Sequence, residues 1–337
     1  MARLERIEDL ADKFVRVRLP RIDRVDLNLF EFDYDLTLMA FFLNAEEQIY
    51  ARYGGRDARS PDSRQSVAGL RYTMQSALQM HERNEKTFAP RLRKASRFLR
   101  EASTSGRFGR GCVHCHQVKE ARNADLDREG KWDRNLAWRY PLPENLGFEL
   151  EVDRGNVIRE VKDHSSAFAA GLKRGDVLRR LNGVPIHSFA DTQFALDIAP
   201  KTGAIEVVWQ RGDAVQTGKL SLPAGWRQTD ISWRPSMRAS VPNPRLYGPD
   251  LTPEEKTALG LPPKQLAFRQ KDSVSKDAQA AGVRGGDIIL GIAGKPLDTN
   301  ADGFLKHVRS NYLVGDEVTI NVIRNGNRLN LAMTLPR

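Results

Sequence analysis

Residues 169–178 read AAGLKRGDVL, and residues 280–290 read AAGVRGGDIIL. In both stretches a glycine follows two alanines, at a place where a helix end favours a residue that adopts a left-handed backbone. A Gly-Asp pair then makes a tight turn into an apolar strand. The chain of 337 residues therefore contains an internal repeat, and we expect each copy to build the same small fold.

The segments around both copies also match one another. Residues 146–150 (LGFEL) and 181–186 (LNGVPI) flank the first copy, and residues 259–261 (LGL) and 292–297 (IAGKPL) flank the second. With these apolar-Gly-apolar loops and Gly-Asp turns, both halves resemble the PDZ domains of bacterial HtrA-like proteases. The resemblance implies two domains, over 141–223 and 251–337. A Trp- and Pro-rich segment over 224–250 joins them, and we expect it to pack on a domain surface.

A PDZ domain binds the C-terminus or an extended segment of a partner, which adds as a strand to the edge of the domain. The backbone N–H groups of the apolar-Gly-apolar loop would bind the carboxylate. The resemblance assigns peptide binding to Leu146, Gly147, Phe148 and Leu150, and to Leu259, Gly260 and Leu261; core packing is the alternative role. Pro262 and Pro263 remove backbone donors after the second loop, so we expect the second domain to bind peptides poorly or to serve as a packing partner.

The chain has only two cysteines, Cys112 and Cys115, and His116 follows directly. The C-x-x-C-H pattern is typical of c-type haem attachment. Its two thiols form thioethers with the haem vinyl groups, and the histidine binds the iron. We therefore expect one covalent haem c per chain, held by Cys112, Cys115 and His116 in a short helical segment over residues 86–140.

Alternatives to haem remain open for this motif. A redox dithiol or disulfide would follow a hydrophobic strand, whereas residues 103–111 are polar. A zinc site would need a second pair of ligands. The sixth iron ligand is expected to be His81 or Met237. Met74 and Met80 are rivals, and each of these side chains has ordinary packing as its alternative.

The first 85 residues resemble the second half of a thioredoxin-like fold. The expected elements are strands at 14–18, 38–43 and 49–55 and a helix that starts near 60–63 and continues to 78. Residues 3–13 match the tail of the thioredoxin active-site helix, and the strand before that helix is absent. Residues 35–37 (DLT) stand where a cis-proline is expected, so the resemblance transfers no catalytic residue.

The net charge of +10 raises the possibility of nucleic-acid binding, but no groove-reading motif accompanies it, and we expect none. Basic residues recur at helical spacing over 83–110, which indicates a solvated helix face or a surface for anionic lipid or an acidic redox partner. The longest apolar run, residues 36–43, is too short to cross a bilayer. No secretory signal is visible. Because bacteria attach haem c outside the cytoplasm, we expect a periplasmic or otherwise exported protein whose signal peptide is missing from this chain.

The sequence thus predicts a multidomain α+β protein with a truncated thioredoxin-like unit, a helical C-x-x-C-H segment and two PDZ domains of β-sandwich or barrel-like form. This order is similar to multidomain exported proteins of planctomycete-like bacteria. We expect a haem-bearing protein that binds a partner's peptide segment and transfers electrons, or senses redox state or a gas. The alternatives are a PDZ scaffold without haem, and a thiol-disulfide oxidoreductase whose dithiol lies upstream or is Cys112 with Cys115. A protease is not expected, because the sequence has no Gly-x-Ser-Gly nucleophile segment.

Overall fold

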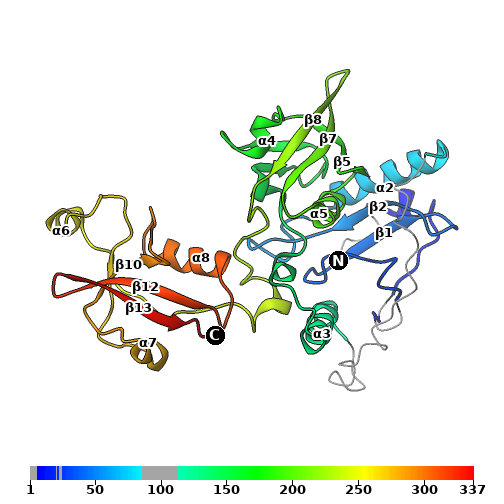
Figure 1. Cartoon of the computed structure of the whole chain (residues 1–337). Helices are drawn as coiled ribbons and strands as arrows, with labels where there is room; N and C mark the ends of the chain where they lie inside the picture. Colours follow the sequence, from blue (N-terminus) through cyan, green and yellow to red (C-terminus); the bar gives the residue numbers. More distant parts are fainter. Residues whose placement is uncertain (1–5, 20, 23–24, 86–112) are drawn as a thin grey trace. The chain divides into compact units, whose positions relative to one another are not determined.

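Figure 1 shows the computed structural model of the chain, which describes residues 6–19, 21–22, 25–85 and 113–337. The chain divides into two compact units, residues 1–228 and 229–337, and each has its own hydrophobic core. Cys112 and the predicted basic stretch from residue 86 onward lie outside the described residues. The described part of the chain is a mixture of helices and antiparallel sheets.

A β-hairpin and a long helix form the N-terminal part of the first unit (Figure 1). Strand β1 (Met39–Leu43) pairs antiparallel with β2 (Ile49–Gly54), as the sequence predicts. Helix α2 (Val67–Glu82) begins after Ser66, whose hydroxyl accepts a hydrogen bond from the amide of Gly69 at 2.9 Å. The helix therefore starts a few residues later than predicted, at its cap, and its apolar face packs on the hairpin.

The strand expected at residues 14–18 does not form. Val15 and Val17 are 95% and 75% exposed, so the alternation of apolar and basic residues there buries neither face. The short helix α1 (Glu8–Ala11) precedes this segment, and its Leu10 packs in the cluster beneath α2. Because these elements amount to one hairpin, one long helix and one short helix, the thioredoxin-like arrangement stays a prediction.

Helix α3 (Cys115–Arg128) begins within the cysteine motif, and the 3-10 helix η4 (Arg134–Trp138) comes next. Val118 and Ala121 of α3 are buried in a cluster with apolar residues of the N-terminal region; these include Leu27, Phe32, Tyr34 and Leu36. The ammonium group of Lys119 is also buried and lies 3.4 Å from the Asp35 carboxylate. Residues 115–128 are therefore helical, and they pack on the chain that precedes the hairpin.

The first copy of the repeat builds what we call the first module, residues 143–222. Its antiparallel sheet has the order β6-β5-β7-β8, and a second sheet pairs β3 with β4. The strands are β3 (Phe148–Leu150), β4 (Ile158–Val161), β5 (Val177–Leu181), β6 (Val184–Pro185), β7 (Gly203–Arg211) and β8 (Ala214–Leu222). The helices are η5 (Pro143–Leu146), α4 (Ser166–Ala169) and α5 (Phe189–Asp197). Together these elements enclose one apolar core.

The second copy builds the second module, residues 246–335, in the second unit. Its sheet repeats the same strand order as β11-β10-β12-β13, with β9 added on β10. The strands are β9 (Phe268–Arg269), β10 (Ile288–Ile292), β11 (Lys295–Pro296), β12 (Glu317–Arg324) and β13 (Asn327–Thr334). The helices of the unit are η6 (Pro235–Met237), α6 (Pro253–Ala258), α7 (Lys276–Ala280) and α8 (Ala301–Asn311).

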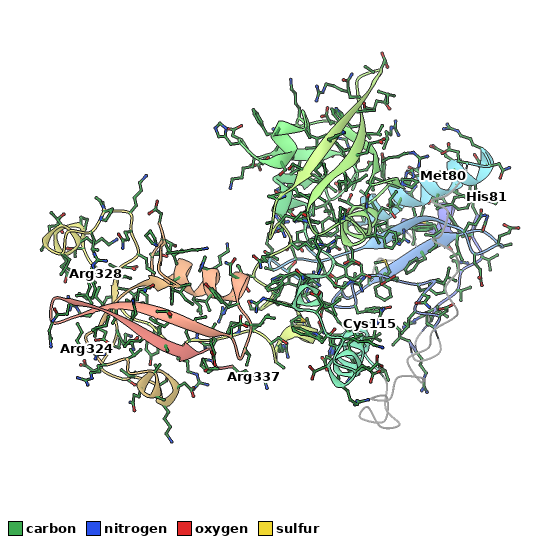
Figure 2. All side chains as sticks on the ribbon, in the orientation of Figure 1. Met80, His81, Cys115, Arg324, Arg328 and Arg337 are labelled. Atoms are coloured by element: carbon green, nitrogen blue, oxygen red, sulfur yellow. The ribbon has the colours of Figure 1, made fainter. Side chains whose placement is uncertain are left out.

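The Gly-Asp turns have the same geometry in both modules. Gly171 and Gly282 take φ values of 89° and 88°, which confirms the left-handed helix ends that the sequence predicts. In the second module the Asp287 carboxylate accepts a hydrogen bond from the amide of Arg284 at 2.8 Å and from the Arg324 guanidinium at 2.7 Å. Arg324 is one of the residues labelled in Figure 2.

The first module contains the same clamp. Asp176 accepts from the amide of Lys173 and from the Arg211 guanidinium, each at 2.8 Å. Both aspartates are 1% exposed, so each turn depends on a buried carboxylate whose charge is matched by an arginine from a central strand.

We expect Asp287→Ala to lower the free energy of unfolding of the second unit by about 2 kcal/mol or more, because it leaves the turn amide and Arg324 without their acceptor. Urea unfolding followed by circular dichroism measures this. Arg269→Ala, which removes an exposed ion pair with Glu255, is the matched control and should change the same quantity by less than about 0.5 kcal/mol. Equal effects of the two substitutions would contradict the role of the clamp.

Candidate functional site

One wall of the candidate groove in the first module is strand β3 with the turn before it. Gly147 ends η5 with φ at 86°, and a Cβ there would meet the Ser165 side chain at 2.1 Å, so the turn requires glycine. Leu146, Phe148 and Leu150 are at most 2% exposed and lie in the core. Of the residues that the resemblance assigns to peptide binding in this module, Gly147 forms the turn and the three apolar side chains lie in the core, so their part in peptide binding stays a prediction.

The other wall is helix α5, whose polar side chains are buried to an unusual degree. Asp191, Thr192 and Gln193 are 1%, 0% and 3% exposed. Buried polar groups need partners, and several of these come from outside the module. Gln193 donates from Nε2 to the carbonyl of Tyr140 at 3.1 Å. Strand β2 of the N-terminal hairpin packs directly on this helix.

Arg52 of β2 contacts α5 through both its backbone and its side chain. Its amide donates to Asp191 Oδ1 at 3.0 Å, and its carbonyl accepts from the hydroxyl of Ser188. Its guanidinium lies 3.6 Å from the same carboxylate and 3.8 Å from the centroid of the Phe194 ring. Burial raises the pKa of Asp191 to about 6, although the charge of Arg52 opposes this rise.

A second arginine, Arg64, lies between the two walls of the first module. Its guanidinium pairs with Glu144 of η5 and lies 3.6 Å from Glu149 of β3. It also lies 4.7 Å from the ring centroid of Phe189 in α5. Only 3% of the Arg64 side chain is exposed, so the chain itself fills the space between β3 and α5 at this point.

In the second module, the segment that corresponds to β3 is residues 247–251. It runs antiparallel to β9, through an Asp250–Phe268 bridge and a hydrogen bond from the amide of Leu251 to the carbonyl of Ala267 at 2.9 Å. The amide of Lys271 donates to the carbonyl of Tyr247, as Lys162 does to Gly147 in the first module. The carboxylate of Asp250 accepts from the amide of Ala301, which joins this segment to the start of α8.

The predicted loop at Leu259, Gly260 and Leu261 lies elsewhere, at the end of α6. Gly260 takes φ at 66° to end that helix, and Leu261 is 5% exposed in a small apolar cluster. The two prolines after it are likewise outside the segment that pairs with β9. Tyr247 and Gly248 were not named from the sequence; the available signal was the Tyr-Gly pair itself, which matches the Leu-Gly pair at the start of the first module.

The cysteine motif is described only from Val113 onward. Cys115 is the first residue of α3, and its thiol is partly buried beside the cluster of Val118 and Ala121. Burial raises the pKa of the Cys115 thiol. The Nδ1 atom of His116 lies 2.8 Å from Glu120 Oε1, one helical turn ahead. Among the described residues, no three His, Cys, Asp or Glu side chains cluster as metal ligands would.

The proposed sixth ligands belong to other parts of the chain. Figure 2 shows His81 at the end of α2, next to Met80, and Cys115 at α3. His81 Nδ1 lies 3.1 Å from the hydroxyl of Tyr50, and Met80 and Met74 are 4% exposed in the core under the hairpin. Met237 lies in the second unit and is 1% exposed. The three methionines are therefore buried, whereas His81 is exposed and its ring contacts the Tyr50 hydroxyl.

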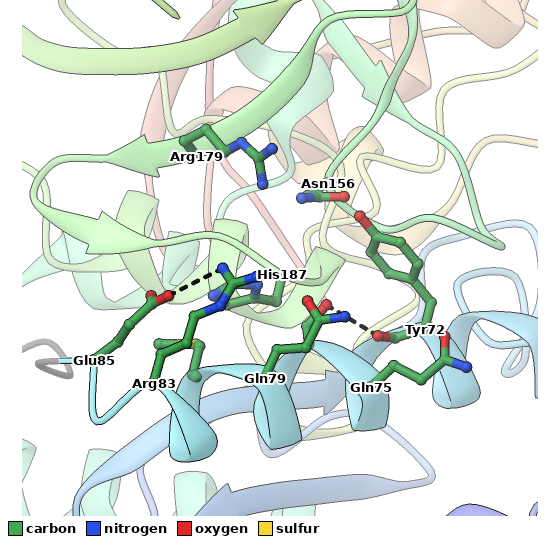
Figure 3. Close-up of a pocket in the computed structure, with 10 residues that line it drawn as sticks. Tyr72, Gln75, Gln79, Arg83, Glu85, Asn156, Arg179 and His187 are labelled. Carbon is green, nitrogen blue, oxygen red and sulfur yellow. Dashed lines mark hydrogen bonds and ion pairs between the residues drawn. The ribbon is translucent and has the colours of Figure 1, made fainter. Parts of the chain in front are cut away.

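A polar cavity of about 190 Å³ lies between α2 and the first module (Figure 3). Tyr72, Gln79 and Arg83 line one side, and Asn156, Arg179 and His187 the other; Gln75, Ser76, Met80 and Glu85 complete the lining. Asn156 Oδ1 and His187 Nε2 are buried without a hydrogen-bond partner among the described residues. Burial, together with the charges of Arg179 and Arg180, lowers the pKa of His187 to about 4.

This pKa predicts a loss of stability in acid. The folded chain keeps His187 neutral between about pH 6.5 and 4, whereas the unfolded chain binds a proton there, so the free energy of unfolding falls as the pH falls through this window. The raised pKa of Asp191 has the opposite effect, because it increases the free energy of unfolding as the pH falls over much of the same range. The contribution of His187 must therefore be read from a difference between two proteins.

Between pH 7 and pH 4.5, the free energy of unfolding should fall by about 2 kcal/mol less in His187→Gln than in the wild type. Urea unfolding followed by tryptophan fluorescence at the two pH values measures this. His164→Gln, which replaces an exposed histidine of the same module, is the control. Parallel pH profiles for the wild type and His187→Gln would show that His187 does not resist protonation.

Comparison with known proteins identifies part of this architecture. Residues 157–211 match the PDZ domain family, so the first module is a PDZ domain. The probable periplasmic serine protease do/HhoA-like of Haemophilus influenzae is 29% identical over 145 residues, which are 43% of this chain and 28% of that protein. The periplasmic pH-dependent serine endoprotease DegQ of Escherichia coli is 28% identical, over 43% of this chain and 30% of that protein. The matched part is less than a third of the length of these relatives.

Solved structures of HtrA-type proteases also align with the chain. The HtrA-type protease AlgW with decapeptide aligns at 19% identity and a TM-score of 0.24, over 40% of this chain and 41% of that chain. No helix in the described part of the chain is both long and apolar enough to cross a membrane.

Proposed function

We propose that this chain is an exported peptide-binding protein, and that its second module captures an extended segment or C-terminus of a partner protein. The PDZ match of the first module and the repeated strand order of the second support this function. The similarity to periplasmic serine proteases supports an exported location. The observation that carries the proposal is that the strand-like segment 247–251 pairs with β9 on one side and is joined through Asp250 to the start of the partly exposed helix α8.

The second module offers the two kinds of contact that β-strand addition needs. The edge segment supplies backbone donors and acceptors to the incoming strand, and side-chain pockets beside it supply specificity. Helix α8 presents Ala301 and Leu305 as partly exposed apolar residues, while Phe304 and Val308 anchor the helix in the core. A partner's apolar side chain would pack on Leu305.

A basic and aromatic pair lies at the start of this edge. Tyr247 is 44% exposed, and the Lys271 ammonium lies 5.7 Å from its ring centroid. An exposed cation next to the turn favours the carboxylate of a peptide terminus over a neutral or basic segment. The second module is therefore proposed to prefer a free C-terminus with an apolar last side chain.

Selection from a library of displayed peptides with free C-termini, with the full chain as bait, tests this function. We expect enrichment of peptides with apolar C-terminal residues, and a selected peptide should bind Leu305→Asp at least about tenfold more weakly than the wild type. Lys306→Asp, on the exposed side of the same helix, is the matched control and should retain affinity. A failure to enrich any sequence above a bait-free control would contradict the proposal.

A covalent haem is the second candidate function, and the His116–Glu120 contact favours it. A haem-binding histidine uses one ring nitrogen for the iron and the other for a hydrogen bond that fixes the ring. Glu120 occupies Nδ1, which leaves Nε2 as the ligating atom. Cys115 and His116 would hold the group together with Cys112, and the haem would supply one-electron chemistry. With the haem, we propose that residues 1–85 form a thioredoxin-like region on which a redox partner docks.

The thiol-disulfide alternative is weaker, because the raised pKa of Cys115 lowers the thiolate fraction that attacks a disulfide. Co-expression of the exported chain with a haem-maturation system, followed by intact mass under denaturing conditions, separates the two. We expect a gain of one haem mass that Cys112→Ala and Cys115→Ala together abolish, with a Soret band lost in parallel. An unmodified mass would exclude haem and leave peptide binding as the function.

A further inference from the structure

We propose that the groove of the first module is an arginine-binding site, and that the chain's own residues 55–64 occupy it and so exclude a partner peptide. This inference rests on the proposed peptide-binding function and assigns each module a different role. The first module docks an internal segment, and the second binds the partner. The recognised chemistry is a guanidinium group carried on an extended or looped segment.

The guanidinium of Arg64 contacts every element that forms the groove. It pairs with Glu144 in η5, which leads into the turn at Gly147. It lies near Glu149, the outward-facing residue of β3, and over the ring of Phe189, the first residue of α5. The module thus surrounds a single planar cation with two carboxylates and one aromatic face, an arrangement that suits arginine better than lysine.

The loop that carries Arg64 is held in place before it meets the module. Asp57 accepts from Nε of Arg64 at 2.8 Å and from the Arg59 guanidinium at 2.8 Å. Burial opposes ionisation of Asp57, but hydrogen bonds from Arg59 and Ser63 lower its pKa to about 2. Gln65 Nε2 donates to the carbonyl of Gly55 at 2.9 Å and so ties the two ends of the loop together.

The fit between loop and helix is tight. A Cβ at Gly55, where φ is 135°, would meet the Phe189 ring at 2.5 Å, so the backbone of the loop lies directly on α5. Arg59 adds a second contact to β3, with its guanidinium 3.2 Å from Glu149. A peptide strand could not occupy this space while the loop is in place, because Arg64 and Gly55 already touch both walls.

The groove needs a cation for a physical reason. Burial raises the pKa of Glu144, and the charge of Arg64 counteracts this rise. Removal of Arg64 would take the counter-charge from the partly desolvated carboxylate of Glu144, which is costly. Glu149, by contrast, would keep its ion pairs with Arg59 and Arg159. An external ligand that replaced the loop would therefore have to supply a cation to Glu144, and the Phe189 ring beside it suits a planar guanidinium group. The second module has alanine, Ala301, as the first residue of its helix, where the first module has Phe189.

Fluorescence anisotropy with a labelled peptide of residues 55–66, acetylated and amidated at its ends, tests this in the full chain. The wild type should bind the peptide weakly because its groove is filled. Arg64→Gln should bind it at least about tenfold more tightly, a difference of about 1.4 kcal/mol. The double variant Arg64→Gln with Glu149→Gln should lose this gain in peptide affinity. A peptide in which lysine replaces the residue equivalent to Arg59 should bind nearly as well. A peptide in which lysine replaces the residue equivalent to Arg64 should bind more weakly.

Equal affinity of the wild type and a folded Arg64→Gln chain would overturn the proposal. Arg64→Lys keeps the positive charge and serves if Arg64→Gln fails to fold. It too should bind the peptide more tightly than the wild type, because an ammonium group loses the stacking on Phe189; a folded Arg64→Lys chain with wild-type affinity would also overturn it. Leu305→Asp should not alter binding of this probe, so a failure of the second module's function stays distinguishable.

Discussion

Two arginines of the N-terminal region, Arg52 and Arg64, are buried against the first module, and a buried charge is tolerated only when it is paired and hydrogen-bonded. Asp191, Glu144 and Glu149 provide that pairing, together with the rings of Phe194 and Phe189. These contacts fix the hairpin on helix α5 and explain why the polar residues of that helix are buried. The filled groove follows from the same requirement, since the carboxylates that hold Arg64 line it.

The two modules share a scaffold and differ in what covers it. Both have a Gly-Asp turn whose aspartate binds an arginine from the neighbouring strand, and both have the same strand order. This common frame positions a strand edge next to a helix in each module. In the first, charged residues at the edge and an aromatic residue on the helix bind the chain itself. In the second, the corresponding helix begins with Ala301 and keeps Leu305 partly exposed, which suits an external apolar side chain.

The parts of the fold that the sequence predicts correctly depend on local patterns. The Gly-Asp turns require positive φ at Gly171 and Gly282, and the β1–β2 hairpin and α2 follow from apolar periodicity, so these are readable from residues that are close in sequence. The strand at 14–18 is wrong because alternation alone does not supply a partner strand. The edge of the second module was predicted at 259–261 because the Leu-Gly-Leu pattern resembles the first loop; only long-range pairing with β9 identifies 247–251.

The occupant of the first groove was likewise not readable, because Arg64 is separated from Glu144 by 80 positions in the chain. Hydrogen–deuterium exchange of the intact protein tests the central claim most directly, since exchange of α5 amides reports whether the hairpin and the Arg64 loop cover that helix. The account predicts that Arg64→Gln speeds exchange in residues 189–197 and leaves residues 301–311 unchanged. Equal protection of α5 in the wild type and in Arg64→Gln would contradict it.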